Sequence, residues 1–131
     1  MTANRIVRIN AGSTALSAVA MLAGRSFLYP QFGLPGPLLL DSVAIGFLLY
    51  AAVMAFAAAR LPVGRRALLA FAFIDAAWVV VSAMALVSFW PHFTIAGRAL
   101  IVAVALVVEL FAALQFRAAG VNRRRLTASL S

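Results

Sequence analysis

Two carboxylic acids, Asp75 and Glu109, lie inside otherwise apolar stretches of this 131-residue chain. Asp75 lies nine positions after Arg66, and Glu109 lies eight positions before Arg117. At about 1.5 Å per helical residue, both carboxyl groups are predicted to lie roughly 12 to 14 Å from the same membrane interface. An ionisable group at that depth costs about 2.5 to 3.5 kcal/mol on insertion scales, and it commonly marks a functional site.

Two ionised carboxylates a few Å apart in a low dielectric repel each other, so such a pair would share one proton. The pair could serve as a proton relay, bind a cation together with Ser and Tyr oxygens, or hold the polar end of a quinone or lipid. The structural alternative is hydrogen bonding between helices that stabilises packing or recruits a partner helix. The sequence leaves these alternatives open.

The same counting places two further polar residues at this depth. Ser17 lies nine residues from Arg8, and Tyr50 lies ten from Arg60. We therefore predict an intramembrane polar cluster of one residue from each of four helices, namely Ser17, Tyr50, Asp75 and Glu109.

A second polar pair is predicted at the opposite end of the helices. Arg25 precedes a Pro and Gly-rich connection and Asp41 follows it, at similar distances from its two ends. Because the flanking helices are expected to run antiparallel, the two charges would lie at similar depth. An ion pair between Arg25 and Asp41 would lower the cost of burying both.

The composition indicates a membrane protein. Hydrophobic residues make up 66% of the chain and the mean hydropathy is +1.07, whereas soluble domains are about 45 to 50% apolar. The net charge of +8 comes from arginines at the ends of apolar runs, so it indicates membrane topology and not nucleic-acid binding. With no cysteine and a single histidine, we expect no metal site. Because the chain also offers no nucleophile and no phosphate-binding loop, we expect no cofactor and no enzymatic activity.

The apolar runs predict an all-α, antiparallel bundle of four transmembrane helices that forms one membrane domain over residues 1–131. The helices are expected at about 9–29, 38–59, 67–90 and 97–117, each close to the roughly 20 residues that cross a bilayer. Short connections rich in Pro and Gly should make consecutive helices antiparallel neighbours. A polar tail is predicted at 118–131, and a secretory signal is the alternative interpretation of the first run.

The arginines also predict the orientation. Only Arg25 and Arg98 lie near one side, which makes the other side the cytoplasmic one and places both termini there. We therefore expect a multi-pass protein of the inner (cytoplasmic) membrane. The arginines on the predicted cytoplasmic side are Arg5, Arg8, Arg60, Arg65, Arg66, Arg117, Arg123, Arg124 and Arg125.

Two segments resemble a pattern found in small bacterial four-helix integral membrane proteins of unassigned function. The segment Asp75-Ala-Ala-Trp78-Val-Val-Val-Ser82 resembles Asn-x-x-Trp-x-x-x-Ser, with aspartate in place of asparagine. The segment that runs from Leu114-Gln115 through Gly120 to Arg123-Arg124 resembles Leu-Gln-x-x-Gly-x-Arg-Arg, with extra residues before the glycine. The resemblance implies a four-helix membrane fold and no mechanism.

These observations favour a non-enzymatic accessory or self-associating subunit of a membrane complex. Its expected partners are the lipid bilayer and another membrane protein or a second copy of the chain, and nucleic acid is not expected. The alternatives are a proton- or cation-conducting component that uses Asp75 and Glu109, and a bundle that binds a quinone or lipid.

Overall fold

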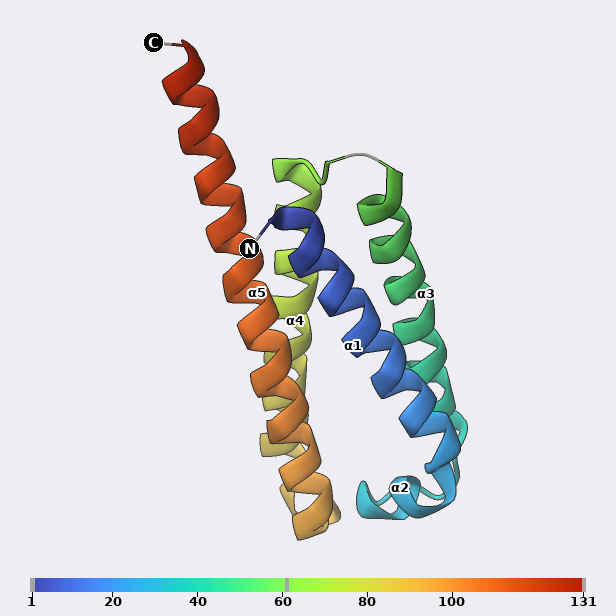
Figure 1. Cartoon of the computed structure of the whole chain (residues 1–131). Helices are drawn as coiled ribbons and strands as arrows, with labels where there is room; N and C mark the ends of the chain where they lie inside the picture. The colour runs from blue at the N-terminus through green and yellow to red at the C-terminus, as the bar shows by residue number, and fades with distance from the viewer. Residues whose placement is uncertain (1, 61, 131) are drawn as a thin grey trace.

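The computed structural model describes residues 2–60 and 62–130, and all regular structure in this part of the chain is helical. The predicted all-α fold, with four long apolar helices, is confirmed (Figure 1). Two short elements join the long helices at one end of the bundle. In chain order the elements are α1 (Ala3–Ala23), α2 (Arg25–Gln31), α3 (Leu38–Arg60), α4 (Arg65–Ser88), the 3-10 turn η1 (Trp90–His92) and α5 (Ile95–Leu130).

The first predicted span, 9–29, is wrong at both ends. Helix α1 begins at Ala3 because the Thr2 hydroxyl accepts a hydrogen bond from the Arg5 backbone N–H at 3.3 Å and so caps the first turn. It ends at Ala23, and Gly24 separates it from the short helix α2. Glycine is a weak helix former, which accounts for the break at this position.

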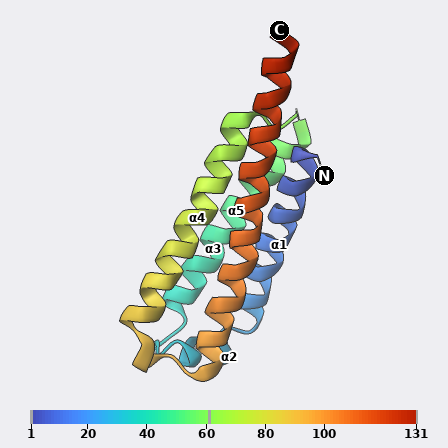
Figure 2. The ribbon, with the colours of Figure 1, turned by 90° about the vertical axis from the view of Figure 1, so that its left-hand side faces the viewer.

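The predicted polar tail at 118–131 follows the last candidate span, which ends at Gly120, but it is helical, because α5 continues to Leu130. All five prolines of the chain lie before residue 92, so no residue of α5 breaks its backbone hydrogen bonding. The polar composition after residue 117 limits how far the apolar surface extends, but it does not end a helix. Figures 1 and 2 show this end of α5 extending beyond the other helices.

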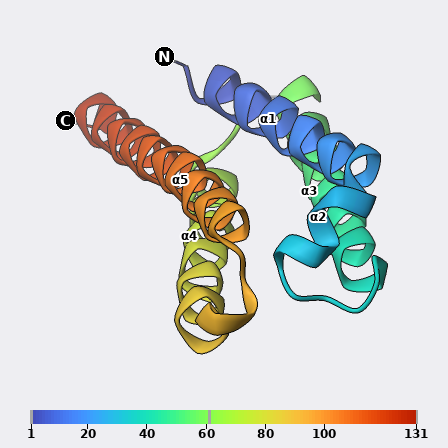
Figure 3. The same ribbon diagram turned by 90° about the horizontal axis from the view of Figure 1, so that it is seen from below.

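The long helices are arranged as two pairs. Helix α1 packs along α3, and α4 packs along α5 (Figure 3). The two pairs meet chiefly where α1 contacts α5, whereas the backbones of α3 and α4 approach each other at few points. Helices α3 and α4 are antiparallel neighbours, as predicted, but they pack less closely than the helices within each pair. Their contact is made by side chains, including the ring pairs Phe47–Trp78 and Tyr50–Phe71.

Alanines allow the close approach within each pair. Small side chains let helix backbones pack closely in a membrane, where apolar lipid removes the hydrophobic drive for association. The buried alanines recur at seven-residue intervals, which keeps them on one face of each helix. They are Ala11 and Ala18 in α1, Ala44, Ala51 and Ala58 in α3, and Ala112 and Ala119 in α5.

Four helices are long and apolar enough to cross a membrane, which fits a multi-pass membrane protein. The start of α1, the connection between α3 and α4, and the end of α5 lie toward one end of the bundle (Figures 1 and 2). The connections that contain α2 and η1 lie at the opposite end. Of the arginines that predict orientation, the side chains of Arg60, Arg123, Arg124 and Arg125 lie outside the described residues.

At the α2 end, two glycines permit close contacts between connections. Gly33 has a φ of +68°, a conformation that other residues rarely adopt, and a Cβ there would lie 2.6 Å from the His92 carbonyl oxygen. Gly97 of α5 lies directly against the carbonyl of Gln31, which accepts a hydrogen bond from the Thr94 N–H at 2.9 Å. These contacts attach α2 to the first turn of α5.

We expect Gly97→Ala to lower the free energy of unfolding by about 1 to 3 kcal/mol, because the new methyl group would overlap the Gln31 backbone. Gly12→Ala is the matched control, since a Cβ at Gly12 meets nothing within 4 Å and alanine favours helix. Denaturant unfolding in detergent micelles, followed by circular dichroism, measures both. Equal stability of the two variants would contradict the tight contact.

Candidate functional site

A cluster of hydrogen bonds around Asp75 joins all four long helices. The Asp75 Oδ2 atom accepts from the side-chain amides of Asn10 in α1 and Gln115 in α5, each at 2.8 Å. The Asp75 Oδ1 atom accepts from the Tyr50 hydroxyl of α3 at 3.0 Å. The Asn10 amide nitrogen also donates to Gln115 Oε1 at 3.1 Å. We call Asn10, Tyr50, Asp75 and Gln115 the Asp75 cluster.

The cluster is shielded from its surroundings. Asn10, Asp75 and Gln115 are 3%, 4% and 0% exposed. A carboxyl group buried to this degree needs hydrogen-bond donors, because leaving it without partners would cost several kcal/mol. The donors that it receives are two amides and one hydroxyl, all of them neutral. The cluster therefore gives the carboxyl group hydrogen-bond partners but no opposite charge.

The Tyr50 hydroxyl lies between two acceptors. It is 3.0 Å from Asp75 Oδ1 and 3.2 Å from the backbone carbonyl oxygen of Phe71. A phenol has one proton, so it can donate to only one of these atoms at a time. With Asp75 ionised, Tyr50 donates to the carboxylate, and with Asp75 protonated the carboxyl can donate to Tyr50 while Tyr50 donates to Phe71. Both protonation states are thus satisfied without movement of the heavy atoms.

The four predicted cluster residues have different environments. Tyr50 and Asp75 are hydrogen-bonded to each other as described above. Ser17 lies closer to the α2 end, where its hydroxyl donates to the Ser13 carbonyl of its own helix at 2.9 Å. Glu109 is exposed and is not among the hydrogen-bond partners of Asp75, so the expected carboxylate pair is wrong.

Glu109 differs from Asp75 in both depth and direction. The hydrogen bond between Asp75 and Gln115 places these residues level on antiparallel helices, so Glu109, six residues along α5, lies about 9 Å farther toward the α2 end. At roughly 100° per residue, Glu109 points about 120° away from Gln115 around the helix. The prediction that Asp75 and Glu109 lie at equal depth is therefore wrong.

The error comes from treating the innermost arginines as markers of the interface. The pairing of Asp75 with Gln115 places residue 125, and not Arg117, level with Arg65 of α4. In α1, the Arg8 guanidinium reaches the Ala58 carbonyl at the end of α3, with an N to O distance of 3.2 Å. An arginine can extend its long stem along apolar surface, so its Cα can lie well inside the span.

Asn10 and Gln115 were therefore missed, because each lies two residues from an arginine that served as a marker of the interface. The face of the helix on which each residue lies could have identified it, whereas its distance from an arginine could not. Gln115 lies four residues after Phe111 and four before Ala119, both buried apolar residues. A polar side chain on a buried stripe requires an internal partner.

A cavity of about 480 Å³ adjoins the Asp75 cluster on the side of the α2 end. It lies between the two helix pairs, and Asn10, Tyr50 and Asp75 provide polar groups at one end of it. Its other walls are largely apolar and aromatic. The remaining lining residues are Ser13, Thr14, Ser17, Val43, Gly46, Phe47, Ile74, Trp78, Ala103, Val104, Val107, Val108 and Phe111.

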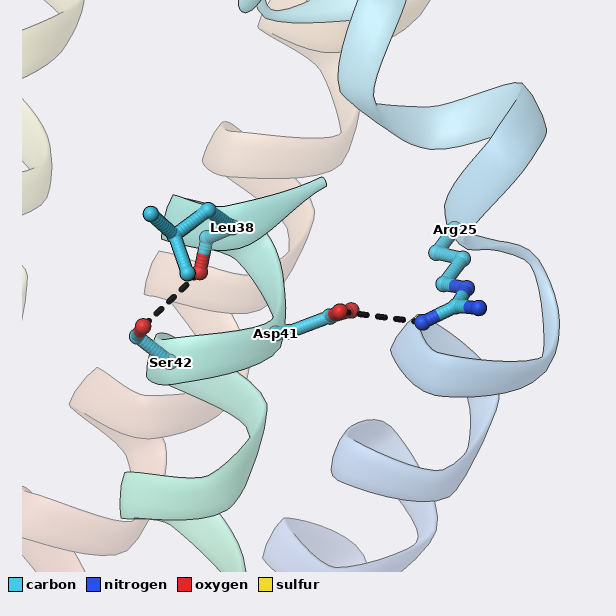
Figure 4. A network of polar contacts seen from close by, with 4 residues as sticks. All are labelled: Arg25, Leu38, Asp41 and Ser42. Carbon is cyan, nitrogen blue, oxygen red and sulfur yellow. Dashed lines mark hydrogen bonds and ion pairs between the residues drawn. The ribbon is translucent and has the colours of Figure 1, made fainter. Parts of the chain in front are cut away.

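The predicted contact between Arg25 and Asp41 is present. The Arg25 guanidinium lies 3.0 Å from Asp41 Oδ2, and the two side chains are 53% and 23% exposed (Figure 4). Next to Asp41, the Ser42 hydroxyl donates to the Leu38 carbonyl at 2.7 Å. An ion pair this exposed stabilises a fold by about 1 kcal/mol at most. We interpret it as a link between α2 and α3 at the end of the bundle.

Within the described part of the chain, no three acidic, histidine or cysteine residues are grouped so as to hold a metal ion. Comparison of the chain with protein families, curated proteins and solved structures gave no match. The resemblance to small bacterial four-helix membrane proteins therefore stays a prediction. The two segments that carry it supply Asp75 and Gln115, which are hydrogen-bonded to each other.

If the Asp75 cluster holds the helix pairs together, Asn10→Ala and Gln115→Ala should each lower the free energy of unfolding by about 1 to 2 kcal/mol. The double variant should lose less than the two single losses added together, because each change breaks bonds that the other residue shares. Ser42→Ala, which removes a hydrogen bond within one helix, is the control. A double-mutant cycle in detergent measures the coupling, and strictly additive losses would contradict it.

Proposed function

We propose that this protein is a non-enzymatic membrane subunit that self-associates through the outward face of α5. The observation that carries the proposal is the exposed carboxyl group of Glu109 near the middle of the span Ile95–Gly120. A carboxyl group facing lipid has no hydrogen-bond partner there, and such groups almost always face protein or water. Among the candidate spans this one is also the least covered, with 11% of its most apolar 18-residue stretch buried against 22–28% in the corresponding stretches of the others.

The residues around Glu109 form a regular seam on α5. They follow one another at spacings of four, three, four, three and four residues, which is the a/d pattern of a two-helix coiled coil. All are exposed, including Leu106 at 61% and Val102 at 43%. We call this set the α5 seam, and its members are Val102, Leu106, Glu109, Ala113, Phe116 and Gly120.

A second copy of the chain is the simplest partner for the α5 seam. Two copies related by a two-fold axis along the membrane normal have the same topology, so Glu109 meets Glu109 of the other copy at equal depth. A protonated carboxyl group both donates and accepts, so the two side chains can satisfy each other in lipid. Ala113 and Gly120 are small enough to let the helices approach closely on one side of the acid.

The arginines also bear on which membrane holds the protein and on which side its termini lie. The asymmetry of the arginines in the sequence supports an inner (cytoplasmic) membrane protein with both termini in the cytoplasm. Conduction of protons or cations receives less support, because that hypothesis depended on a pair of acids and Glu109 lies away from Asp75. The Asp75 cluster is better explained as the internal link between helix pairs.

Cross-linking tests the α5 seam directly, because the chain has no cysteine of its own. Single cysteines at Leu106 and Ala113 should form disulfide-linked dimers in membranes, since both belong to the seam and would meet their own copies. Leu49→Cys, on the exposed face of α3 and 65% exposed, is the matched control and should give few dimers. Equal cross-linking at Leu49 and Leu106 would indicate random collision and contradict the proposal.

The role of the acid is tested separately. Glu109→Leu should reduce the dimer fraction in detergent about tenfold, whereas Glu109→Gln should largely preserve it because an amide pair also hydrogen-bonds. Sedimentation equilibrium measures the fraction. Unchanged dimerisation of the leucine variant, or purification of the seam covered by a different membrane protein, would overturn self-association.

A further inference from the structure

The cavity between the helix pairs has the size and composition of a ligand site. Its volume of about 480 Å³ lies within the roughly 300 to 1,000 Å³ that is typical of small-molecule pockets. It also has the usual division into apolar walls and a few convergent polar groups. The cavity is not explained by the two roles already assigned, the link between helix pairs through the Asp75 cluster and self-association through the α5 seam.

The charge of the lining selects the chemistry of a ligand. Asp75 is the only residue with a carboxylate among those that line the cavity, and these described residues include no arginine. The three donors to Asp75 are neutral and come from Asn10, Tyr50 and Gln115. An anionic head group would therefore meet a negative charge with no cation to offset it. A positive charge would be complementary.

The walls favour a cation with an apolar body. Phe47, Tyr50, Trp78 and Phe111 contribute aromatic rings to the lining, and the faces of such rings attract cations in a desolvated site. The Phe47 and Trp78 rings pack edge to face with centroids 4.8 Å apart, so they form a continuous aromatic surface from α3 to α4. Aliphatic residues of α5, including Val104 and Val108, complete the wall opposite α1.

Further polar atoms lie along one wall. Thr14 and Ser17 of α1 line the cavity, and both hydroxyls donate to other groups, to Asn10 Oδ1 at 3.2 Å and to the Ser13 carbonyl at 2.9 Å. Their oxygens keep lone pairs that can accept from an ammonium group. The Trp78 Nε1 atom is buried, and it has no hydrogen-bond partner among the described residues. This N–H is a donor, so only an acceptor atom could satisfy it, and it does not itself select a cation.

We propose that the cavity binds a lipophilic cation, an apolar molecule with one positive charge, which the Asp75 carboxylate and the aromatic wall hold together. The ligand would enter from the bilayer, because all the lining residues belong to the four spans. This site shares no residue with the α5 seam. Val107 and Phe111 line the cavity and lie about 160° around α5 from Glu109, so the two surfaces are on opposite sides of the helix.

Tetraphenylphosphonium is a suitable probe, because it carries a fixed charge on an aromatic body. A Trp90→Phe background leaves Trp78 as the single tryptophan, since the chain has two. We expect saturable quenching or a spectral shift of Trp78 fluorescence in detergent micelles, with equilibrium dialysis of labelled probe as a second measurement. Triphenylphosphine oxide, which is uncharged, should bind at least tenfold more weakly.

Two variants test the site by different routes. Asp75→Asn removes the charge while it keeps a side chain of the same shape, and it should weaken binding at least tenfold. Gly46→Leu fills the cavity, and it should abolish binding without a backbone clash, since a Cβ at Gly46 meets nothing within 4 Å. Gly12→Leu and Glu109→Gln are the controls, because neither residue lines the cavity, and both should bind as the unmodified protein does.

Unchanged binding in Asp75→Asn, or equal binding of the neutral and charged probes, would overturn the cation assignment. Unchanged binding in Gly46→Leu would place the probe outside the cavity and overturn the site itself. Because Gly46→Leu leaves the Asp75 cluster intact, its unfolding midpoint distinguishes loss of the site from loss of the fold.

Discussion

The arrangement of the bundle depends on the need of one buried carboxyl group, Asp75, for hydrogen-bond donors. Within each helix pair, alanines allow close packing and lipid-facing residues need no partner. Between the pairs, apolar contacts contribute little, because lipid solvates an apolar side chain as well as another helix does. A polar atom left in lipid is costly, so Asn10 of α1, Tyr50 of α3 and Gln115 of α5 are all drawn to α4. The same bonds set the register of each helix against α4.

This link divides the interior into two unlike halves. Toward the connection between α3 and α4, buried apolar side chains from all four spans pack into one core, which includes Val7, Met54, Leu68 and Ala119. Toward the α2 end, the same helices leave a cavity. The ring contact between Phe47 and Trp78 bridges α3 and α4 there, and large rings hold backbones farther apart than alanines do. The space therefore follows from where the small and the large residues occur along the helices.

Much of this architecture could be predicted from the sequence, because hydropathy reports lipid exposure directly. The number of spans, the contact of Tyr50 with Asp75 and the ion pair of Arg25 with Asp41 agree with the structure. Depth was harder to predict, because Arg8 and Arg117 lie farther from the ends of the helices than the depth count assumed, and this concealed Asn10 and Gln115. Direction around a helix was harder still. Glu109 could be assigned to the outside only when the partners of Asp75 were known.

The two intramembrane acids thus have different physical situations, and each situation limits what the acid can do. Asp75 has three donors from its own chain, so its carboxyl group is held in place inside the bundle, beside the cavity in which a cation would bind. Glu109 is exposed among apolar residues of α5, so its carboxyl group needs a hydrogen-bond partner from outside the four-helix bundle. Since α5 carries Glu109 on one face and cavity residues on the opposite face, burial of the α5 seam would hold the cavity wall in place. Self-association would then order the wall of the binding site without contributing any residue to it.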